Sequence, residues 1–151
     1  MKKIFLSLIA VFAISALSCN SIARESVVNI NSTPQKAQSF IKENFGDKKI
    51  LSIVKDSELM DVEYKVYFAD GTNINFNSKG EWKEIDGERN CIPTSVIPAN
   101  IKNFVAENYP DNCICKIEID KELVSSQYNV ELQNRMELKF DKNGSFMGFD
   151  D

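Results

Sequence analysis

The chain has 151 residues, with 22 acidic and 18 basic side chains, a net charge of −4 and no histidine. The missing histidine excludes Ser-His-Asp and Cys-His catalytic sites and histidine-containing zinc sites. The acidic balance disfavours nucleic acid and anionic membrane surfaces as partners.

Residues 1–23 have the layout of a secretory signal peptide. Two lysines are followed by an apolar run that ends at Leu17, and a small-x-small cleavage site precedes Arg24. The apolar run is too short for a good membrane span. We therefore predict an exported, periplasmic protein with a frayed leader over residues 24–31. The alternative is a lipoprotein anchored through Cys19, whose preceding residues match a lipobox poorly.

The rest of the chain contains one pattern twice, 64 residues apart and without a gap. Such a repeat indicates the architecture directly, because each copy is one structural unit. We assign residues 32–87 to the first unit, 88–94 to a linker and 95–151 to the second unit. The clearest identities are Phe40 with Phe104, Tyr64 with Tyr128, Val66 with Val130, Phe76 with Phe140, and Gly80 with Gly144.

Each unit begins with a predicted helix. Ser32 or Thr33 can cap a first helix that starts at Pro34, and the second helix starts in the same way at Pro98. Apolar residues at helical spacing give each helix a buried face. These residues are Ala37, Phe40, Ile41 and Phe45 in the first helix, and Ile101, Phe104, Val105 and Tyr109 in the second.

After each helix the apolar residues alternate, which is typical of strands with one buried face. The strands are expected at 50–54, 64–68, 74–76 and 81–85, and again at 116–119, 128–132, 136–140 and 145–149. The predicted fold class is α+β: a tandem repeat of one helix plus a four-stranded antiparallel sheet. The two units are expected to form a concave sheet with the helices on its other face.

The sheet face away from the helices is the candidate binding surface, since antiparallel sheets often leave one face in water. Tyrosine and tryptophan are enriched among the residues that dominate protein interfaces. The alternative for Trp82 and Phe146 is that they complete the packing between helix and sheet. The predicted site has Tyr67, Trp82 and Phe146 as anchors, with Lys65, Glu131, Glu137 and Lys139 around them.

Three cysteines remain in the predicted exported chain, Cys91, Cys113 and Cys115. An oxidising compartment permits one disulfide. Two cysteines at alternate positions of one strand are about 6.6 Å apart, which is long for a bridge. We therefore expect Cys91 to pair with either of the other two, and the alternative is that all three are reduced.

Two patterns are candidates for chemistry. The turns 77–80 and 141–144 resemble the opening of a calcium loop, but both lack the later acidic ligands and fit hairpin turns better. The carboxylates of Asp56, Glu58, Asp61, Glu63, Asp120 and Glu122 could supply a glycosidase pair but are expected to be solvated. We predict no enzyme activity, no cofactor and no metal site.

The blocks 40–45, 64–71, 80–86, 97–101, 138–144 and 148–150 resemble the exported PepSY-like proteins of Bacteroides-type bacteria, which are similar in fold to the β-lactamase inhibitor protein. The resemblance implies a periplasmic or surface location, a concave sheet and no established enzyme activity. We expect a non-enzymatic binding protein that recognises a protein or peptide, as an inhibitor or regulator of a secreted enzyme. The alternative is a periplasmic sensor of a small ligand or of calcium.

Overall fold

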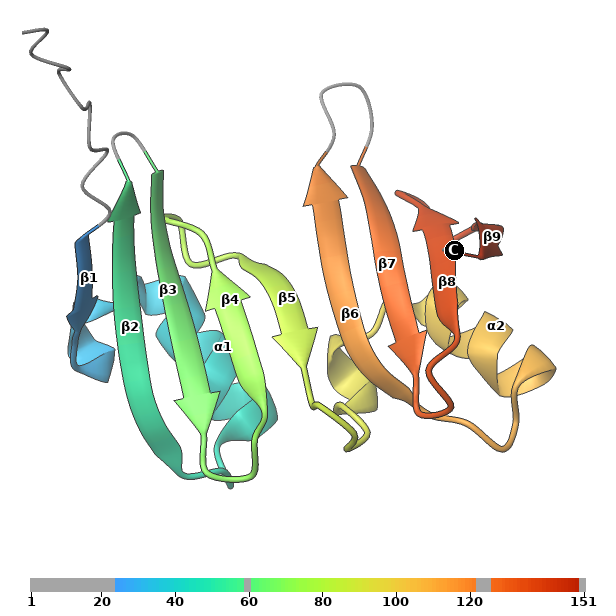
Figure 1. Cartoon of the computed structure of the whole chain (residues 1–151), viewed down its shortest axis with the longest axis horizontal. Helices are drawn as coiled ribbons and strands as arrows, with labels where there is room; N and C mark the ends of the chain where they lie inside the picture. The colour runs from blue at the N-terminus through green and yellow to red at the C-terminus, as the bar shows by residue number, and fades with distance from the viewer. Residues whose placement is uncertain (1–23, 59–60, 122–125, 150–151) are drawn as a thin grey trace, which may run out of the picture.

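The computed structural model describes residues 24–58, 61–121 and 126–149. The predicted signal peptide, the lipidation candidate Cys19 and the carboxylate of Glu122 lie outside these residues. The described chain consists of two α-helices and one nine-stranded antiparallel sheet, as predicted for the α+β class (Figure 1).

The strands follow one another across the sheet in chain order, and each is antiparallel to its neighbours. Helix α1 precedes four strands, β2 to β5, and helix α2 precedes another four, β6 to β9. The elements are β1 (Arg24–Val27), α1 (Gln35–Phe45), β2 (Ile50–Glu58), β3 (Asp61–Phe68), β4 (Asn73–Phe76), β5 (Trp82–Asp86), α2 (Ala99–Asn108), β6 (Ile114–Lys121), β7 (Ser126–Leu132), β8 (Glu137–Asp141) and β9 (Phe146–Phe149).

The expectation of a frayed leader is wrong for Arg24–Val27, which forms the edge strand β1. This strand pairs with β2 from Arg24 opposite Ser57 to Val27 opposite Val54. All four of its residues are exposed, so its sequence lacks the alternation that marks a half-buried strand. Hydrogen bonds to the backbone of β2 hold this strand in place. The order of its own side chains therefore does not predict it.

Strand β5 joins the two halves into a single sheet by pairing with β6. Ile85 lies opposite Ile117 in this pair, and both side chains are fully buried. The linker after β5 stays close to β6, where the backbone N–H of Ile92 donates to the carbonyl of Ile114 at 3.0 Å. The disulfide Cys91–Cys113 crosslinks the linker to the chain just before β6, with 5.6 Å between the Cα atoms.

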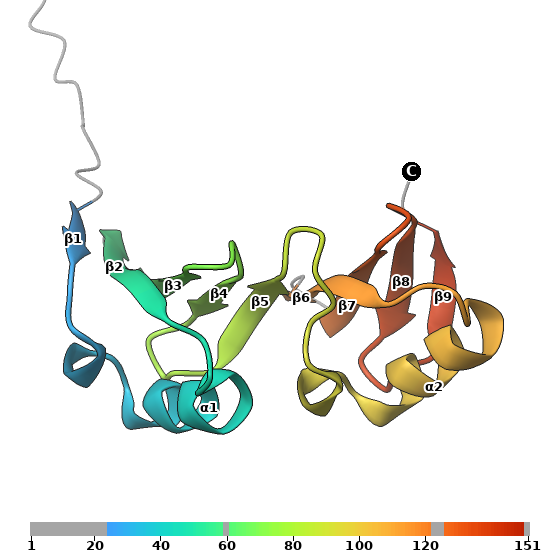
Figure 2. The ribbon, with the colours of Figure 1, turned by 90° about the horizontal axis from the view of Figure 1, so that it is seen from below.

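Both helices lie on the same face of the sheet, as the view along the strands makes plain (Figure 2). Their predicted apolar faces are confirmed, since these residues are buried or pack against the core. Aromatic rings connect each helix to its sheet. Phe40 meets Phe76 edge to face at 5.8 Å between ring centroids, and Phe104 meets Phe140 in the same way at 5.3 Å.

The predicted side-chain cap of the first helix is wrong. Pro34 is the N-cap residue and makes no side-chain capping hydrogen bond. The hydroxyl of Thr33 instead donates to the carbonyl of Ile30 at 2.7 Å, across the short 3₁₀ turn Ile30–Ser32. Thr33 therefore stabilises the turn that leads from β1 into the helix.

The hairpin turn before the last strand of each half packs against the first turn of a helix. Gly80 and Gly144 occupy equivalent places in these turns, and both have a φ of +77°, which favours glycine. A Cβ atom at Gly80 would lie 2.8 Å from the backbone nitrogen of Ala37. One at Gly144 would lie 2.9 Å from the Cβ of Asn100. These glycines let each hairpin approach its helix closely.

Candidate functional site: the open face of the sheet

The open face is defined here as the side chains of the sheet that point away from the helices. Because register partners in an antiparallel pair point to the same side, two rows of these side chains can be followed from strand to strand. The first row is Val27, Val54, Lys65, Asn75, Glu84, Glu118, Asn129, Lys139 and Gly148. The second row is Ser52, Tyr67, Asn73, Asp86, Lys116, Glu131 and Glu137.

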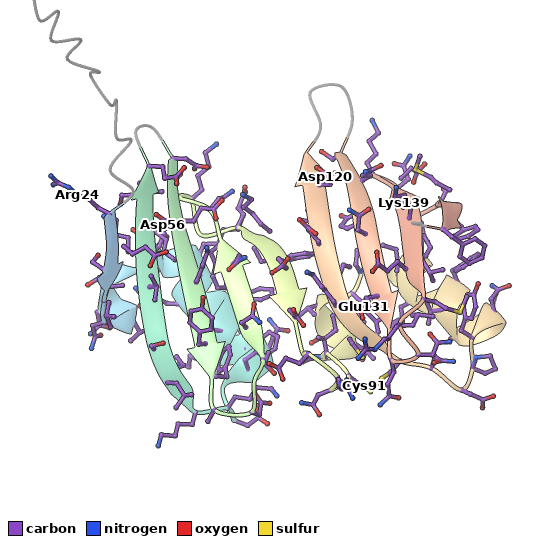
Figure 3. All side chains as sticks on the ribbon, viewed as in Figure 1. Arg24, Asp56, Cys91, Asp120, Glu131 and Lys139 are labelled. Carbon is purple, nitrogen blue, oxygen red and sulfur yellow. A yellow bond between two sulfur atoms is a disulfide. The ribbon has the colours of Figure 1, made fainter. Side chains whose placement is uncertain are left out.

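Five of the seven predicted site residues lie on these two rows. Lys65 and Lys139 belong to the first row, one in each half of the sheet, and Tyr67, Glu131 and Glu137 belong to the second. Tyr67 is 40% exposed and is the aromatic residue of the two rows. Glu131 on β7 and Lys139 on β8 can be located in Figure 3.

The placement of Trp82 on the open face is wrong, because a β-bulge reverses its side. Trp82 pairs with Phe76, a fully buried core residue, and the register shifts between Asn75 and Phe76. Its indole therefore packs against the helix-side core. The next residue, Lys83, points to the open face instead and forms an ion pair with Glu63. A bulge adds one residue, so strict alternation mis-assigns every side chain on its far side.

The prediction that Phe146 lies on the open face is wrong for the same reason, because its ring lies on the helix side of the sheet. It pairs with Phe140 across a register shift at Lys139 and Phe140. Its ring stacks on Phe104 of helix α2 with 4.6 Å between centroids, and lies 5.7 Å from the ring of Phe140. The alternative interpretation, in which Trp82 and Phe146 complete the helix–sheet packing, is the one that the structure supports.

The open face carries a large excess of negative charge. Its ammonium groups are those of Lys65, Lys83, Lys116 and Lys139. Its carboxylates are those of Glu25, Asp56, Glu58, Asp61, Glu63, Glu84, Asp86, Glu118, Asp120, Glu131, Glu137 and Asp141. Twelve carboxylates against four lysines make this face more negative than the chain as a whole, which has a net charge of −4.

Lys83 and Lys116 are engaged by carboxylates within the sheet. The hydrogen bond to Glu63 raises the pKa of Lys83 above its usual value and outweighs the opposite effect of burial. Burial by itself lowers the pKa of Lys116, but the hydrogen bond and charge of Glu84 at 2.9 Å raise it overall. Both lysines therefore stay charged, and each neutralises one neighbouring carboxylate.

Two pairs of carboxylates on the open face lie directly opposite each other on neighbouring strands. Glu84 lies opposite Glu118 at the junction of the two halves, and Glu131 lies opposite Glu137. Like charges that are directly opposite in a sheet destabilise it. The open face therefore stores electrostatic repulsion that a cationic ligand or partner would relieve.

Two shallow depressions lie on this face. One of about 130 Å³ is lined by Lys116, Glu118, Asn129, Val130, Glu131 and Glu137. The other, of about 180 Å³, is lined by Asp56, Glu58, Asp61 and Glu63 at one end of the β2–β3 hairpin. Each depression contains one buried side-chain oxygen that has no hydrogen-bond partner among the described residues, Oδ1 of Asn129 in the first and Oδ1 of Asp56 in the second.

A family described as "Putative beta-lactamase-inhibitor-like, PepSY-like" matches residues 62–148, which contain strands β3 to β8 and helix α2. The chain belongs to this PepSY-like family. No curated protein matches it.

Solved structures of similar proteins agree with the family. A protein of Bacteroides thetaiotaomicron described as a "putative calcium-regulated periplasmic protein" is 37% identical, with a TM-score of 0.78, and the match covers 84% of this chain and 97% of the other. Two proteins of Bacteroides vulgatus, both described as putative periplasmic proteins, are 36% and 32% identical. Their TM-scores are 0.77 and 0.75, and the matches cover 84% and 85% of this chain and 97% and 100% of theirs.

The turns 77–80 and 141–144 of this PepSY-like chain are hairpin turns. Oδ1 of Asp141 accepts hydrogen bonds at 2.8 Å from the backbone N–H groups of Asn143 and Ser145, which lowers the pKa of the carboxyl group. Oδ1 of Asn77 accepts two equivalent bonds, from Lys79 and Glu81. Both turns therefore form hairpins between neighbouring strands, as predicted.

The expectation that Cys91 bonds to one of the other two thiols is confirmed, with Cys113 as its partner. Cys115 keeps a free, buried thiol. Burial raises the pKa of this thiol, and the charges of Glu131 and Asp86 raise it further. Cys115 is therefore a poor nucleophile at neutral pH.

Within residues 24–58, 61–121 and 126–149, no three His, Cys, Asp or Glu side chains are placed to hold a metal ion together. Neither helix is long and apolar enough to cross a membrane in this part of the chain.

Proposed function

We propose that this PepSY-like chain is an exported, non-enzymatic binding protein whose open face recognises a basic segment of another exported protein. A regulatory or inhibitory role toward a secreted enzyme fits the family description and the periplasmic descriptions of its relatives. The single observation that carries the proposal is the excess of carboxylates over lysines on a sheet face that the two helices leave uncovered.

The charge of the open face decides the chemistry of the partner. Complementary charge across an interface directs the encounter and suppresses wrong partners. With Trp82 and Phe146 packed on the helix side, Tyr67 is the aromatic anchor that remains from the predicted site. The partner we expect therefore presents lysine and arginine side chains on an extended or helical segment, with one apolar contact at Tyr67.

The double variant Glu131→Lys and Glu137→Lys tests this proposal. It reverses the charge at one of the two depressions, while the two opposed positions still carry like charges. Glu43→Lys and Glu107→Lys form the matched control, because both residues are exposed on the helices and the net charge changes equally. The readouts are the affinity for a lysine-rich peptide and the set of periplasmic proteins retained on immobilised protein.

We expect the open-face variant to lose the peptide and its salt-sensitive partners, while the helix variant keeps them. Binding should weaken as salt is added, because surface charges are screened within about 8–10 Å at physiological ionic strength. Equal retention by both variants would remove the open face from the interaction. Equal loss would indicate that only net charge matters and would also contradict the proposal.

Calcium binding is the second candidate. It is favoured by the unpartnered Oδ1 of Asp56 in a depression lined by four carboxylates, and by the relative described as calcium-regulated. Calcium takes six to eight oxygen ligands at about 2.3–2.6 Å. Since the four carboxylates do not form a ready-made metal group in the described structure, they would have to draw together around the ion.

Melting curves with added calcium test this second candidate. A ligand that binds only the folded state stabilises it by about 2.7 kcal/mol at a hundred times its dissociation constant. The melting temperature should rise with calcium in the wild type, should not rise in Asp56→Asn, and should still rise in Asp120→Asn, its equivalent 64 residues later. An unchanged melting temperature at millimolar calcium would exclude this function.

A further inference from the structure

Strand β9 exposes an unusual amount of apolar surface for so short a strand. Of the six large apolar side chains that are exposed in the described residues, three belong to β9: Phe146 at 37%, Met147 at 60% and Phe149 at 57%. The strand lies at the end of the sheet, with β8 as its neighbour on one side. It therefore presents apolar side chains and an edge of backbone hydrogen-bonding groups at the same place.

The equivalent strand in the first half of the chain indicates what such an edge accepts. Trp82 of β5 corresponds to Phe146 of β9, and each pairs with the equivalent core phenylalanine across a bulge. The outer edge of β5 is covered by β6, an antiparallel strand. The outer edge of β2 is covered by β1, which is also antiparallel. Strand β9 is thus equivalent to β5, and β5 has an antiparallel neighbour on its outer edge.

The two ends of the sheet are protected differently. Strand β1 places Arg24 and Glu25 on its edge, and charged residues on an edge strand discourage pairing with another chain. Strand β9 contains no charged residue. At the position of Glu84 in β5 it has Gly148, where a Cβ atom would meet nothing within 4 Å. Glycine in a strand commonly marks a place where another backbone approaches closely.

We propose that β9 is a dimerisation strand, which pairs antiparallel with β9 of a second copy of this chain around a two-fold axis. Centring the pair between Met147 and Gly148 places Phe146 opposite Phe149 of the second copy, and Met147 opposite its Gly148. Phe146 and Phe149 both lie on the helix side of the sheet, as their partners Phe140 and Leu138 are core residues. The pairing therefore places the apolar helix sides of the two sheets next to each other across the axis. It brings no like charges together, because residues 146–149 are uncharged.

Pairing of β9 with β9 of a second copy is favoured over a head-to-tail contact between β9 of one copy and β1 of another. A two-fold pair uses the same surface on both copies and closes, whereas a head-to-tail contact repeats into open filaments. The charged edge of β1 opposes the second arrangement. Because four residues and their aromatic neighbours form a small interface, the dimer should be weak and dependent on concentration.

Sedimentation equilibrium of the protein purified from cells expressing the full chain tests the proposal. The wild type should shift from monomer to dimer as its concentration rises, and Met147→Lys should raise the dissociation constant at least about tenfold. The matched control is Val27→Lys, which adds the same charge at an exposed residue of the opposite edge strand and should leave the dimer intact.

Hydrogen exchange supplies a second readout. Amide protection at residues 146–149 should increase with protein concentration in the wild type and stay constant in Met147→Lys. Urea unfolding of a dilute sample should be unchanged in this variant, which separates loss of the dimer from loss of the fold. A chain that is monomeric at every concentration, or a dimer that Val27→Lys dissociates as strongly as Met147→Lys does, would overturn the proposal.

Discussion

The two halves of the molecule, residues 32–87 and 95–151, share several buried residues and differ at several positions of the open face. Val66 and Phe76 recur as Val130 and Phe140, and all four are at most 1% exposed. On the open face, by contrast, Tyr67 is replaced by Glu131. The common residues specify a helix packed on four strands, so the differences between the halves are where recognition should be sought.

The largest expected effect tests the shared core. Phe76→Ala and Phe140→Ala each remove a fully buried ring and should lower the free energy of unfolding by about 3–5 kcal/mol. Phe140 contacts the rings of both Phe104 and Phe146, whereas Phe76 contacts that of Phe40, so the second variant should lose at least as much. Urea unfolding measures both values.

Leu51→Ala is the control for these core variants, because Leu51 is a large apolar residue that is exposed. It should change the unfolding free energy by less than about 0.5 kcal/mol. A small loss for either phenylalanine variant would contradict the view that the two halves have equivalent cores.

The disulfide joins the linker to the second half and has no counterpart in the first half, where Val27 and Lys49 stand 64 residues earlier. Replacing Cys91 and Cys113 by serine opens a crosslink between residues 22 apart in sequence and should cost about 3 kcal/mol. A reducing agent should lower the urea midpoint of the wild type to that of the variant and leave the variant unchanged. A midpoint that is insensitive to both changes would mean that β5–β6 pairing alone holds the linker in place.

The two turn glycines distinguish how each helix meets its sheet. Gly80→Ala and Gly144→Ala both force a Cβ atom into a left-handed conformation and should each cost about 1–3 kcal/mol. The loss should be larger at Gly80, because the new atom meets the backbone nitrogen of Ala37 rather than the side chain of Asn100. Thermal unfolding of the two variants side by side shows whether this order holds.

The smallest expected effect concerns one hairpin turn that has a carboxylate in the first half and a side-chain amide at the equivalent position in the second. The hydrogen bond from Lys48 is the main cause of the lowered pKa of Asp70, whose Oδ1 also accepts from the N–H of Thr72 at 3.1 Å. In the second half Asn134 takes the place of Asp70, and its Oδ1 accepts from Met136 at 3.1 Å.

Since the folded-state pKa of Asp70 lies below the unfolded value of about 3.9, its stabilisation is present above that pH and is lost as the pH falls through the folded pKa. The pair is partly exposed to solvent, so Asp70→Asn should cost less than about 1 kcal/mol at neutral pH. Urea unfolding at about pH 7 and about pH 2.5 should show the difference only at the higher pH. A difference that persists in acid would mean that the turn, and not the ion pair, is affected.

The sequence predicts the elements well because each buried face repeats with the period of its element. Ile41 and Ile101 at helical spacing, and Val66 and Val130 in alternating strands, are all buried as expected. Periodicity fails where the backbone departs from regularity. The bulge that places Trp82 beside the core leaves no mark in the order of apolar residues, so alternation assigned its indole to the wrong face.

The candidate site was predictable in part. Lys65, Tyr67 and Lys139 lie on the open face, where alternation from buried neighbours places them. The concentration of carboxylates was not predictable, because residues such as Glu84 and Glu118 are distant in sequence and meet only through β5–β6 pairing. Charge counted along the chain gives a modest total and does not show which side of a sheet carries it.

The amino-acid sequence by itself determined the class of fold, the membership of the helix and strand cores, and the family resemblance, because these depend on local periods and on a repeat of 64 residues. Tertiary structure decided the rest. Strand pairing recruited Arg24–Val27 as a strand, selected Cys113 as the partner of Cys91, and gathered the carboxylates on one face. These outcomes depend on which backbones lie side by side, and that information is not contained in any single segment of the chain.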